Sequence, residues 1–448
     1  MKKYLFILLL LCVFLSNSNG QTDFEKAARI DLMLRVHTKK NMFSGSVLIA
    51  KKGKVLLSKG YGLANTTSTI SNTPTTKFKL ASVSKQFTAM AIMILQEKGK
   101  LSTEDKLIKY IPDYPNGDKI TIHHLLTHTS GIPNVTALPV FDSIKGNPHT
   151  LEQVIALTKN KPLEFEPGSK FNYSNSGYIL LTYIIETASG KKFGDYMKEA
   201  IFDPLGMKNS GLYPSNGILK NAATGYTEAN EGLIPAPYID MTIPAGAGAL
   251  YSTVEDLFLW DQALYTEKLV KKETMEKIMT VYKDNYAYGW MVTKYKEHKK
   301  FFHGGGIEGF NTVINRFTDD ELCIIILKNV DNYQLFNPNK MATAIMFDEK
   351  FDLPVEHKMI TLDKSVYKKL VGDYELEPGF ILSITTDGNS VFAQATGQDK
   401  NEIYPEAESK YFLKVVDAQL EFNKDDKGNI NSVTLLQGGA KMPGKKIK

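Results

Sequence analysis

The chain has 448 residues, of which 43% are hydrophobic and 23% charged, a composition typical of a globular protein with two or three domains. Its 54 basic and 49 acidic residues leave a formal net charge of +5, without a long basic block. This balance argues against a nucleic-acid-binding protein. The sequence shows no internal repeat and no low-complexity segment.

Residues 1–20 have the pattern of a secretory signal peptide, with Gln21 as the start of the mature chain. Two lysines precede an apolar run over residues 4–15, and small or polar residues follow up to Gly20. A membrane anchor would need roughly 20 apolar residues, and this run has about 12. Because the context of Cys12 is not that of a lipoprotein cleavage site, we expect export, to the periplasm or the medium, without a stable membrane anchor.

The first predicted elements are a β-hairpin and a long apolar helix. Strands at Ser46–Ala50 and Lys54–Ser58 flank a turn that contains Gly53. A mostly helical and loop-rich section then extends to about residue 280. The predicted helices run from Ser82 to about Gly99, over Tyr178–Ile185 before a stop at Gly190, and over Val254–Leu264 behind a cap at Ser252 or Thr253.

Strands return in the second half of the chain, and this order predicts the fold class. Strands at both ends that bracket a helical section indicate an α+β fold, in which an antiparallel sheet assembled from both ends is flanked by helices, with a helical insertion. Cys323, the one cysteine of the mature chain, lies in a predicted buried strand, where we expect core packing and no internal disulfide. The predicted strands are Tyr286–Val292, Lys299–His303, Thr312–Phe317 and Leu322–Leu327.

From about residue 360 the sequence changes to short alternating segments separated by turns. We therefore divide the chain into the signal segment 1–20, a main domain 21–355 and a small all-β domain 356–448, a barrel or a sandwich. Asp425–Asn429 is interpreted as a hairpin turn, because the spacing of a calcium-binding EF-hand loop is missing. Strands are predicted at Ile381–Ile384, Ser390–Ala393, Tyr411–Lys414 and Gln419–Phe422.

Ser82-Val83-Ser84-Lys85 carries the clearest chemical signal. Positions three apart share one face of a helix, so the Ser82 hydroxyl and the Lys85 amine can touch. A serine becomes a good nucleophile when an adjacent base takes its proton, and a lysine can be that base when burial or a nearby charge lowers its pKa. The same spacing at Ser189–Lys192 and Ser365–Lys368 lacks a strong helix behind it; the alternative for Ser82 is a helix cap.

Two further segments offer partners for Ser82. In Tyr173-Ser174-Asn175, residues two apart point the same way in an extended chain, so one site can receive a phenol for proton transfer and an amide for a substrate carbonyl. The glycines of His303-Gly304-Gly305-Gly306, at the end of a predicted strand, indicate close approach of a backbone or a ligand. The N–H groups of Gly306 and Ser82 can then form an oxyanion hole. The alternatives are a surface turn and a flexible glycine loop with an incidental histidine.

His124 and His128 are four apart on a possible helix, the spacing of a zinc-binding pair. The glutamate of an H-E-x-x-H motif is absent, however, and no third ligand stands out. We therefore predict no metal site and assign both histidines to packing and hydrogen bonding near the entrance of the site.

Together these segments resemble the serine β-lactamase and penicillin-binding protein superfamily, and within it the branch of class C β-lactamases, DD-peptidases, D-aminopeptidases and related esterases. The likeness covers about residues 30 to 350, and no G-x-S-x-G motif of an α/β-hydrolase occurs. Phe78–Lys85 is similar to the nucleophile motif, Tyr173-Ser174-Asn175 to the Y-x-N motif, His303-Gly304-Gly305 to the K-T-G motif with histidine replacing lysine, and Ile122–Gly131 to another stretch typical of the branch.

The resemblance implies a two-step acyl transfer that needs no metal and no organic cofactor. Ser82 would attack an amide, lactam or ester carbonyl, Lys85 as general base and Tyr173 as acid and base would move the proton, and the Ser82 and Gly306 N–H groups would hold the oxyanion. A histidine titrates near pH 6.5, so we expect weaker selection for a free substrate carboxylate than lysine would give. The implied substrate-binding residues are Asn175, His303, Gly304 and Gly305.

The implied function is that of an exported serine hydrolase of the penicillin-binding protein type, with DD-peptidase-like, D-aminopeptidase-like or esterase activity. Its partner would be a small-molecule or peptide substrate, including cell-wall peptide. One alternative is a class C-like β-lactamase, and another is a binding or sensor protein that penicillin acylates without turnover. A scaffold whose β domain binds a partner is disfavoured by the intact Ser82, Lys85 and Tyr173.

Overall fold

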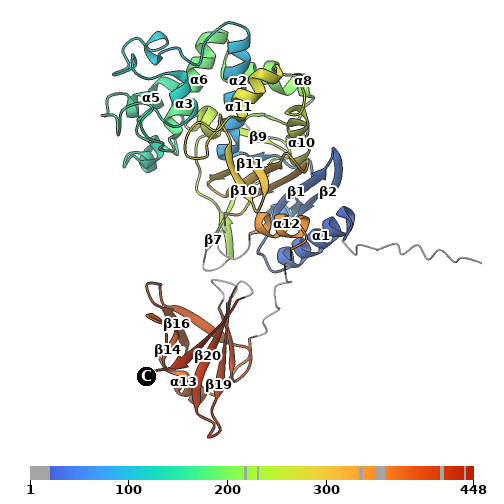
Figure 1. Ribbon diagram of the computed structural model, residues 1–448, viewed down its shortest axis with the longest axis vertical. Helices are drawn as coiled ribbons and strands as arrows, with labels where there is room; N and C mark the ends of the chain where they lie inside the picture. Colours follow the sequence, from blue (N-terminus) through green and yellow to red (C-terminus); the bar gives the residue numbers. More distant parts are fainter. Residues whose placement is uncertain are drawn as a thin grey trace, which may run out of the picture.

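The computed structural model describes residues 21–215, 219–229, 232–331, 337–349, 351, 359–413, 418–437 and 440–448. The predicted signal segment and the predicted domain boundary at residues 355 and 356 lie outside these ranges. Among the described helices, none combines the length and the apolar character that crossing a membrane requires. Figure 1 shows a body of helices around a sheet and, below it, an all-β body that contains the C-terminus.

A six-stranded antiparallel sheet, in the order β10-β11-β12-β13-β1-β2, forms the centre of the first body. The hairpin β1–β2 comes from the start of the chain, and β13 pairs with β1 in a register that places Gly45 opposite Lys328. The predicted sheet built from both ends of the domain is confirmed. The strands are β1 Gly45–Lys51, β2 Lys54–Tyr61, β10 Met291–Tyr295, β11 His298–Ile307, β12 Phe310–Phe317 and β13 Leu322–Lys328.

The predicted strand Tyr286–Val292 is wrong for most of its length, because β10 begins only at Met291. Gly289 turns the chain with a φ of 76°, and a Cβ atom there would lie 2.7 Å from the Lys85 carbonyl oxygen. The loop therefore packs against the helix behind Ser82. In the sequence, Tyr286 and Trp290 belong to an alternating pattern of large and small residues that is typical of a strand. In the structure, both side chains are buried but lie in a loop.

Helices cover both faces of this sheet, as Figure 1 shows. On the inner face, α2 (Ser84–Glu97) and α10 (Val254–Ala263) pack on the large core. On the outer face, α1 (Asp23–Lys39) and α12 (Pro338–Met346) pack on a second core. Alternate residues of a strand face opposite sides, so neighbours on β13 divide between the two cores: Ile325 and Leu327 point inward, and Ile324 and Ile326 outward.

The helical section extends the inner core and contains the longest helix after α1, α6 (Asn175–Ser189). The prediction placed the start of α6 three residues late, and Gly190 ends the helix in the left-handed conformation, as expected. The other elements are α3 Ile122–Leu126, α4 Phe141–Ile144, α5 Leu151–Lys159, α7 Phe193–Met197, α8 Asp203–Leu205, α9 Ala245–Gly248, α11 Lys272–Met279, the short turns η1 Ala81–Val83, η2 Leu107–Lys109, η3 Val135–Ala137 and η4 Lys198–Phe202, and the strands β3 Leu63–Asn65, β4 Ile70–Ser71, β5 Phe78–Lys79, β6 Gly211–Leu212, β7 Tyr226–Ala229, β8 Gly232–Pro235 and β9 Leu250–Ser252.

The C-terminal body is a closed antiparallel barrel of the strands β14 to β21 in sequence order. This body has its own core, which includes Tyr374, Tyr411 and Leu420, and the prediction of a separate all-β domain is therefore confirmed. Of the two predicted forms, the domain is a barrel and not a sandwich. Asp425 accepts backbone hydrogen bonds from Lys427 and Asn429 at 2.9 and 2.8 Å, so the turn prediction is confirmed. The elements are α13 Ser365–Leu370, β14 Gly372–Glu377, β15 Phe380–Thr386, β16 Val391–Ala395, β17 Asn401–Pro405, β18 Lys410–Leu413, β19 Ala418–Lys424, β20 Ile430–Gln437 and β21 Ala440–Lys446.

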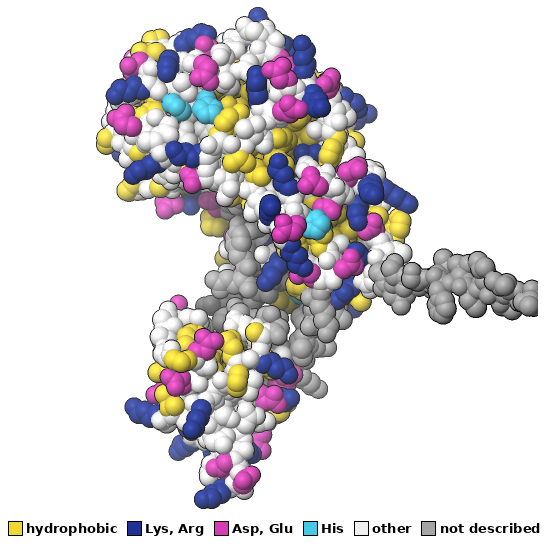
Figure 2. All heavy atoms as spheres, in the orientation of Figure 1, with side chains coloured by type: hydrophobic (Ala, Val, Ile, Leu, Met, Phe, Trp, Pro, Cys, Tyr) yellow, Lys and Arg dark blue, Asp and Glu magenta, His cyan; other side chains and the backbone are white. Residues whose placement is uncertain are grey.

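Charged side chains of both signs are interspersed over the face of the molecule shown in Figure 2. On that face the excess of five positive charges forms no continuous basic surface.

Candidate active site

Ser82 lies in the turn η1 (Ala81–Val83), directly before α2 rather than inside it. Ala81 adopts a positive φ of 48°, a strained conformation for a residue with a side chain. Leu80, which precedes Ala81, is fixed by two hydrogen bonds. Its N–H donates to the Leu250 carbonyl at 2.8 Å, and Thr312 Oγ1 donates to its carbonyl at 2.7 Å. The sheet and β9 thus hold the turn that presents Ser82.

Lys85 is fully buried, and its Nζ lies 3.1 Å from Ser82 Oγ. The same nitrogen contacts Asn175 Oδ1 at 2.8 Å and the Ala247 carbonyl oxygen at 2.9 Å. Neither of these oxygens belongs to a carboxylate, so nothing among these contacts compensates a full positive charge. Burial lowers the pKa of Lys85 well below its ordinary value of 10.5.

These three contacts fit a neutral amine. A neutral amine has two protons, which the Asn175 and Ala247 oxygens can accept, and a lone pair, which then faces Ser82 Oγ. In this arrangement the Ser82 hydroxyl donates to Lys85. The predicted pairing of nucleophile and base is therefore present in the geometry that proton removal requires.

Tyr173 lies next to Lys85, whose Nζ is 4.8 Å from the centre of the Tyr173 ring. The Tyr173 hydroxyl is buried and has no hydrogen-bond partner among the described residues. Burial raises its pKa above the ordinary value of 10.0, and the nearby Ser82 side chain opposes this effect in part. The phenol therefore keeps its proton at neutral pH, as a proton donor to a leaving group must.

Asn175 is the first residue of α6, and its side chain is held at both ends. Its Oδ1 accepts from Lys85, while its Nδ2 lies 3.3 Å from Asn134 Oδ1 and 3.3 Å from Thr136 Oγ1. Asn134 Oδ1 also accepts from the Asn175 backbone N–H at 3.0 Å. The structure thus gives Asn175 a role in orienting Lys85, and its predicted contact with a substrate carbonyl stays a prediction.

His303 is buried, with only 2% of its surface exposed. Its Nδ1 lies 2.7 Å from the Gly304 carbonyl oxygen and its Nε2 lies 3.1 Å from the Tyr286 hydroxyl. These partners fit a neutral ring that donates from Nδ1 and accepts at Nε2. Burial lowers the pKa of His303 from 6.5 to about 3, so the expectation of titration near pH 6.5 does not hold.

β11 continues through the glycines after His303 and ends at Ile307, four residues beyond the end of the predicted strand Lys299–His303. Gly305 faces η1, where a Cβ atom would lie 2.3 Å from the Leu80 carbonyl oxygen and 3.0 Å from Ala81 Cβ. Close approach of another backbone, as predicted, explains this glycine. β10 pairs with β11 only as far as Phe302, so the edge of residues 304–307 that faces away from β12 carries no ladder partner among the described residues. The predicted oxyanion donor Gly306 is on this edge.

His128, which the sequence analysis assigned to packing and hydrogen bonding near the site, has partners that the sequence did not reveal. α3 ends at Leu126, and His128 follows with a φ of 57°. Its ring lies at 4.3 Å from the Tyr173 ring, centre to centre, and its Nδ1 accepts the Ser174 backbone N–H at 3.1 Å. Burial lowers the pKa of His128 well below 6.5, so its ring is neutral. His128 therefore holds the segment that carries Tyr173 and Asn175.

His124 does not share this role, because its Nδ1 instead accepts the Thr121 N–H at the start of α3. His124 and His128 do not lie on one helix, which removes the premise of a zinc pair. Among the described residues, no cluster of three or more histidine, cysteine or acidic side chains could hold a metal ion. Cys323 is buried in β13, in the core position that was predicted.

The comparisons with known proteins agree with this geometry. The family model described as β-lactamase matches residues 30–345. The chain belongs to the β-lactamase family. A second model, described as a domain of unknown function (DUF3471), matches residues 356–445, which form the barrel. The β-lactamase family comprises serine hydrolases that act on amide and ester bonds, and the present chain is a penicillin-binding-protein-like member of it.

Relatives within the β-lactamase family match over most of the chain. "Penicillin-binding protein 4*" of Bacillus subtilis (strain 168) is 31% identical over 427 residues, which cover 89% of this chain and 94% of the relative. The structure of an octameric penicillin-binding protein homologue from Pyrococcus abyssi has a TM-score of 0.66 at 28% identity and covers 95% of this chain and 100% of its own. D-amino acid amidase from Ochrobactrum anthropi SV3, at 21% identity and a TM-score of 0.63, shares the fold over 73% of this chain and 98% of its own.

Proposed function

We propose that the protein is an exported hydrolase that forms an acyl-enzyme on Ser82 and cleaves amide or ester bonds of small or peptide substrates, including D-amino-acid peptides of the cell wall. One observation carries the proposal: a fully buried lysine, without an acidic partner among its hydrogen bonds, lies 3.1 Å from the serine hydroxyl. Such a lysine is a base at neutral pH, and a serine next to it is a nucleophile.

The chemistry then follows in two steps. Ser82 Oγ forms a bond to the substrate carbonyl carbon while its proton moves to Lys85 Nζ. The bond from that carbon to the leaving nitrogen or oxygen then breaks, the leaving group takes a proton from the Tyr173 hydroxyl, and the Lys85 ammonium returns a proton to Tyr173. In the second step, water attacks the acyl-enzyme carbonyl carbon and gives a proton to Lys85. The bond from that carbon to Ser82 Oγ then breaks, and Ser82 takes the proton from Lys85 as the acid is released. The N–H groups of Ser82 and Gly306 are the proposed donors to the oxyanion in both steps.

The neutral His303 supports the choice of substrate class. A lysine in its place would offer a positive charge to a substrate carboxylate, whereas the His303 ring is neutral and both of its nitrogens are already engaged. We therefore propose esters, amides and D-amino-acid peptides as better substrates than β-lactams. In a His303→Lys variant, substrates with a free carboxylate should gain in kcat/KM relative to their methyl esters, and an unchanged ratio would contradict this role.

Intact-mass spectrometry of the mature chain mixed with a β-lactam tests the proposal, with Ser82→Ala as the matched control. A persistent adduct on the wild type alone supports the nucleophile and the peptidase-type reaction. A transient adduct with steady loss of the drug would instead show a β-lactamase. If the same mixtures yield no adduct, and D-aminoacyl anilides and short-chain esters are not cleaved either, the proposal fails.

Export is also proposed here, from the signal pattern of residues 1–20. Expression of the full chain in a bacterial host, followed by fractionation and N-terminal sequencing, tests it. A mature chain that begins at Gln21 in the periplasm or the medium supports export. An uncleaved chain in the cytoplasm contradicts it.

A further inference from the structure

Two segments that start at the candidate active site meet at one ion pair. The first starts at Asn134, whose Oδ1 accepts the Asn175 N–H at 3.0 Å, and continues through α4 to Lys145. The second is the part of β11 that starts at His303 and leads to Glu308, directly after the end of the strand. Lys145 Nζ lies 3.2 Å from Glu308 Oε1. The helical section and the sheet are therefore joined at a point beyond the candidate site.

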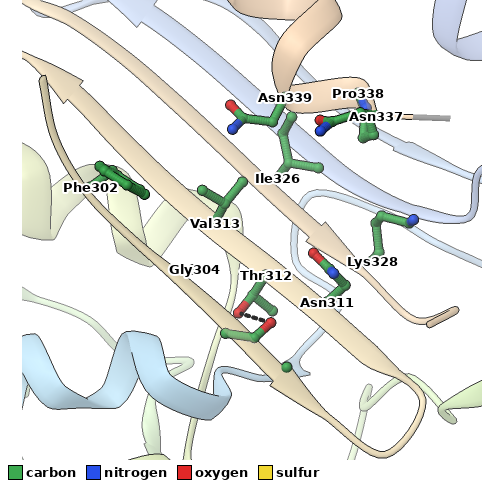
Figure 3. Close-up of a pocket in the computed structure, with 12 residues that line it drawn as sticks. Phe302, Gly304, Asn311, Thr312, Val313, Ile326, Lys328, Asn337, Pro338 and Asn339 are labelled. Carbon is green, nitrogen blue, oxygen red and sulfur yellow. Dashed lines mark hydrogen bonds between the residues drawn. The ribbon is translucent and has the colours of Figure 1, made fainter. Parts of the chain in front are cut away.

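Glycines leave the edge of β11 between its two ends bare. Gly304 and Gly306 are exposed, and β10 pairs with β11 only as far as Phe302. Figure 3 shows this part of the strand from the outer face of the sheet, where Gly304 lies beside Thr312 and a hollow of about 370 Å³ adjoins the glycines. A substrate can thus reach the Gly306 N–H along the edge without meeting a side chain of these glycines.

The leaving group and the acyl group of a substrate lie toward different ends of this edge. Tyr173, the proposed proton donor to the leaving group, has its ring 6.1 Å from the ring of His303, centre to centre. Gly306, the proposed oxyanion donor, follows three residues later on β11. A substrate whose leaving group meets the Tyr173 hydroxyl and whose carbonyl oxygen meets this donor therefore extends its acyl part toward Glu308.

Apolar packing and a backbone hydrogen bond hold the two segments together at this far end. Phe141 of α4 and Ile307 of β11 both pack against one small buried cluster. The Lys145 carbonyl oxygen accepts the Asp240 N–H at 2.8 Å, which ties the end of the first segment to the same part of the chain. The cluster consists of Ile239, Met241 and Ala249.

The ion pair itself is partly shielded from water. The side chains of Lys145 and Glu308 keep 25% and 19% of their surface exposed, so their attraction is screened less than that of a fully exposed pair. Hydrogen bonds to Asp142, at 2.8 Å, and to Glu308 raise the pKa of Lys145. Burial lowers the pKa of a second lysine, Lys79, and the nearby Glu308 carboxylate opposes this effect. Glu308 thus has two lysines near it, which favours a fixed position of its side chain.

We propose that the Lys145–Glu308 pair is the end wall of the acyl side of the site, so that the enzyme takes substrates with a short acyl part: one amino acid, a dipeptide or a short-chain acyl group. A strand rises about 3.3 Å per residue, which places Glu308 about 7 Å along the chain beyond Gly306. This span holds about two extended residues. The inference rests on the proposed Ser82 reaction and narrows its substrates.

Hydrolysis of p-nitrophenyl butyrate and p-nitrophenyl octanoate by the mature protein tests the wall, because these esters share a leaving group and differ only in acyl length. We expect the wild type to cleave the butyrate with a kcat/KM at least tenfold higher. The double variant Lys145→Ala/Glu308→Ala removes both side chains, and its ratio of the two kcat/KM values should fall at least fivefold. An unchanged ratio in this variant, folded by its melting temperature, overturns the proposal.

Two further variants separate the wall from a general loss of structure. Lys198→Ala breaks an exposed ion pair with Asp203 and should leave the ratio unchanged. Glu308→Gln keeps the size of the side chain and an oxygen that can accept from Lys145, so its ratio should stay closer to that of the wild type than the ratio of Glu308→Ala does. The reverse order of these two variants would contradict the wall. A variant that only distorts the site slows both esters alike.

A failure of the proposed reaction has a different result. If the wild type cleaves neither ester faster than Ser82→Ala does, the Ser82 reaction is absent, and the inference falls with it. If the wild type cleaves both esters equally well and Ser82→Ala cleaves neither, the reaction is present and the wall is not.

Discussion

At the scale of single residues, the charge of Lys85 depends on what surrounds it. Its three polar contacts are a hydroxyl and two neutral carbonyl oxygens, and its side chain is fully buried. A charged amine in this position would have lost its water without gaining an anion, so the neutral form is favoured. The same contacts aim the lone pair of the amine at Ser82.

Replacing Lys85 with arginine tests this assignment. A guanidinium stays protonated at every accessible pH and cannot accept the Ser82 proton. We expect Lys85→Arg to lower the rate of Ser82 acylation by about 10²-fold or more, the usual contribution of a general base. Lys192→Arg, in the exposed pair with the same spacing after Ser189, is the matched control and should change the rate by less than about twofold. Equal rates in both variants would contradict the role of Lys85.

The buried histidines make the stability of the protein depend on pH. The pKa of His303 falls from 6.5 to about 3 on folding, so the unfolded chain binds more protons between these values. Stability from this group is present above pH 6.5 and is lost as the pH falls toward 3. Urea unfolding at pH 7 and at pH 4 tests this effect. The free energy of unfolding of His303→Gln should fall less from pH 7 to pH 4 than that of the wild type. A larger loss in the variant would show that the sign is wrong.

While the catalytic roles of Ser82, Lys85 and Tyr173 stay predictions, the contact between Ser82 and Lys85 was open to prediction because one motif carries both residues. His128 was not, because its contribution depends on a chain reversal after α3 that no periodicity indicates. Its positive φ places the ring on Tyr173 and its Nδ1 against the Ser174 N–H. The stretch Thr127–Gly131 was noticed, but its residues could not be paired with a segment more than 40 positions further on.

At the scale of elements, the site forms where the loop after α3 fixes the start of α6. His128 accepts the backbone N–H of Ser174, the N-cap of α6, and so sets the position of Tyr173 on one side and Asn175 on the other. Asn134 adds a second anchor through the Asn175 N–H. The two predicted motifs meet directly through Lys85 and Asn175, and His128 and Asn134, which belong to neither motif, hold the second motif in place.

Two substitutions of His128 separate its two contacts. Asparagine tolerates the positive φ and can accept the Ser174 N–H, whereas phenylalanine keeps a ring on Tyr173 but leaves that N–H without an acceptor. An unpaired buried N–H costs about 1–3 kcal/mol. We therefore expect His128→Phe to slow Ser82 acylation at least tenfold and His128→Asn to retain more of the rate. Full activity of His128→Phe would contradict the positioning role.

Elements that follow simple periodicity were predicted well, and elements that depend on tertiary contacts were not. The hairpin β1–β2 and the helix α2 have clear apolar patterns, and α10 also has the predicted cap at Thr253. The segment Tyr286–Trp290 alternates like a strand, but Gly289 turns it against α2, so tertiary packing decides its conformation. In the barrel, β14, β17, β20 and β21 were missed because closing a barrel needs cross-strand partners that the sequence of a single strand does not reveal.

At the scale of the whole molecule, the main domain and the barrel have separate cores. The barrel core contains no residue of the main sheet, and its strands close on themselves. Each core can then unfold as its own cooperative unit. The main sheet combines strands from both ends of the main domain, so the sheet forms only when the whole domain folds. The barrel, in contrast, is built from strands that are consecutive in the sequence.

Differential scanning calorimetry of the full chain should therefore show two transitions. Leu420→Ala in the barrel and Ile325→Ala in the main sheet each remove a fully buried side chain, at a cost of about 2–5 kcal/mol. Leu420→Ala should lower only one transition temperature and leave Ser82 acylation within about twofold, while Ile325→Ala should lower the other. A single transition that both variants shift would contradict independent units.

The central claim is that a neutral Lys85 activates Ser82, and the pH dependence of the acylation rate tests it most directly. The rate with a β-lactam, followed by intact mass from pH 5 to pH 11, should rise to a plateau with a midpoint well below 10.5, because the pKa of Lys85 is lowered by burial. His303 should add no step near pH 6.5. A rate that still climbs at pH 10, with its midpoint at the ordinary lysine value of about 10.4, would contradict the claim.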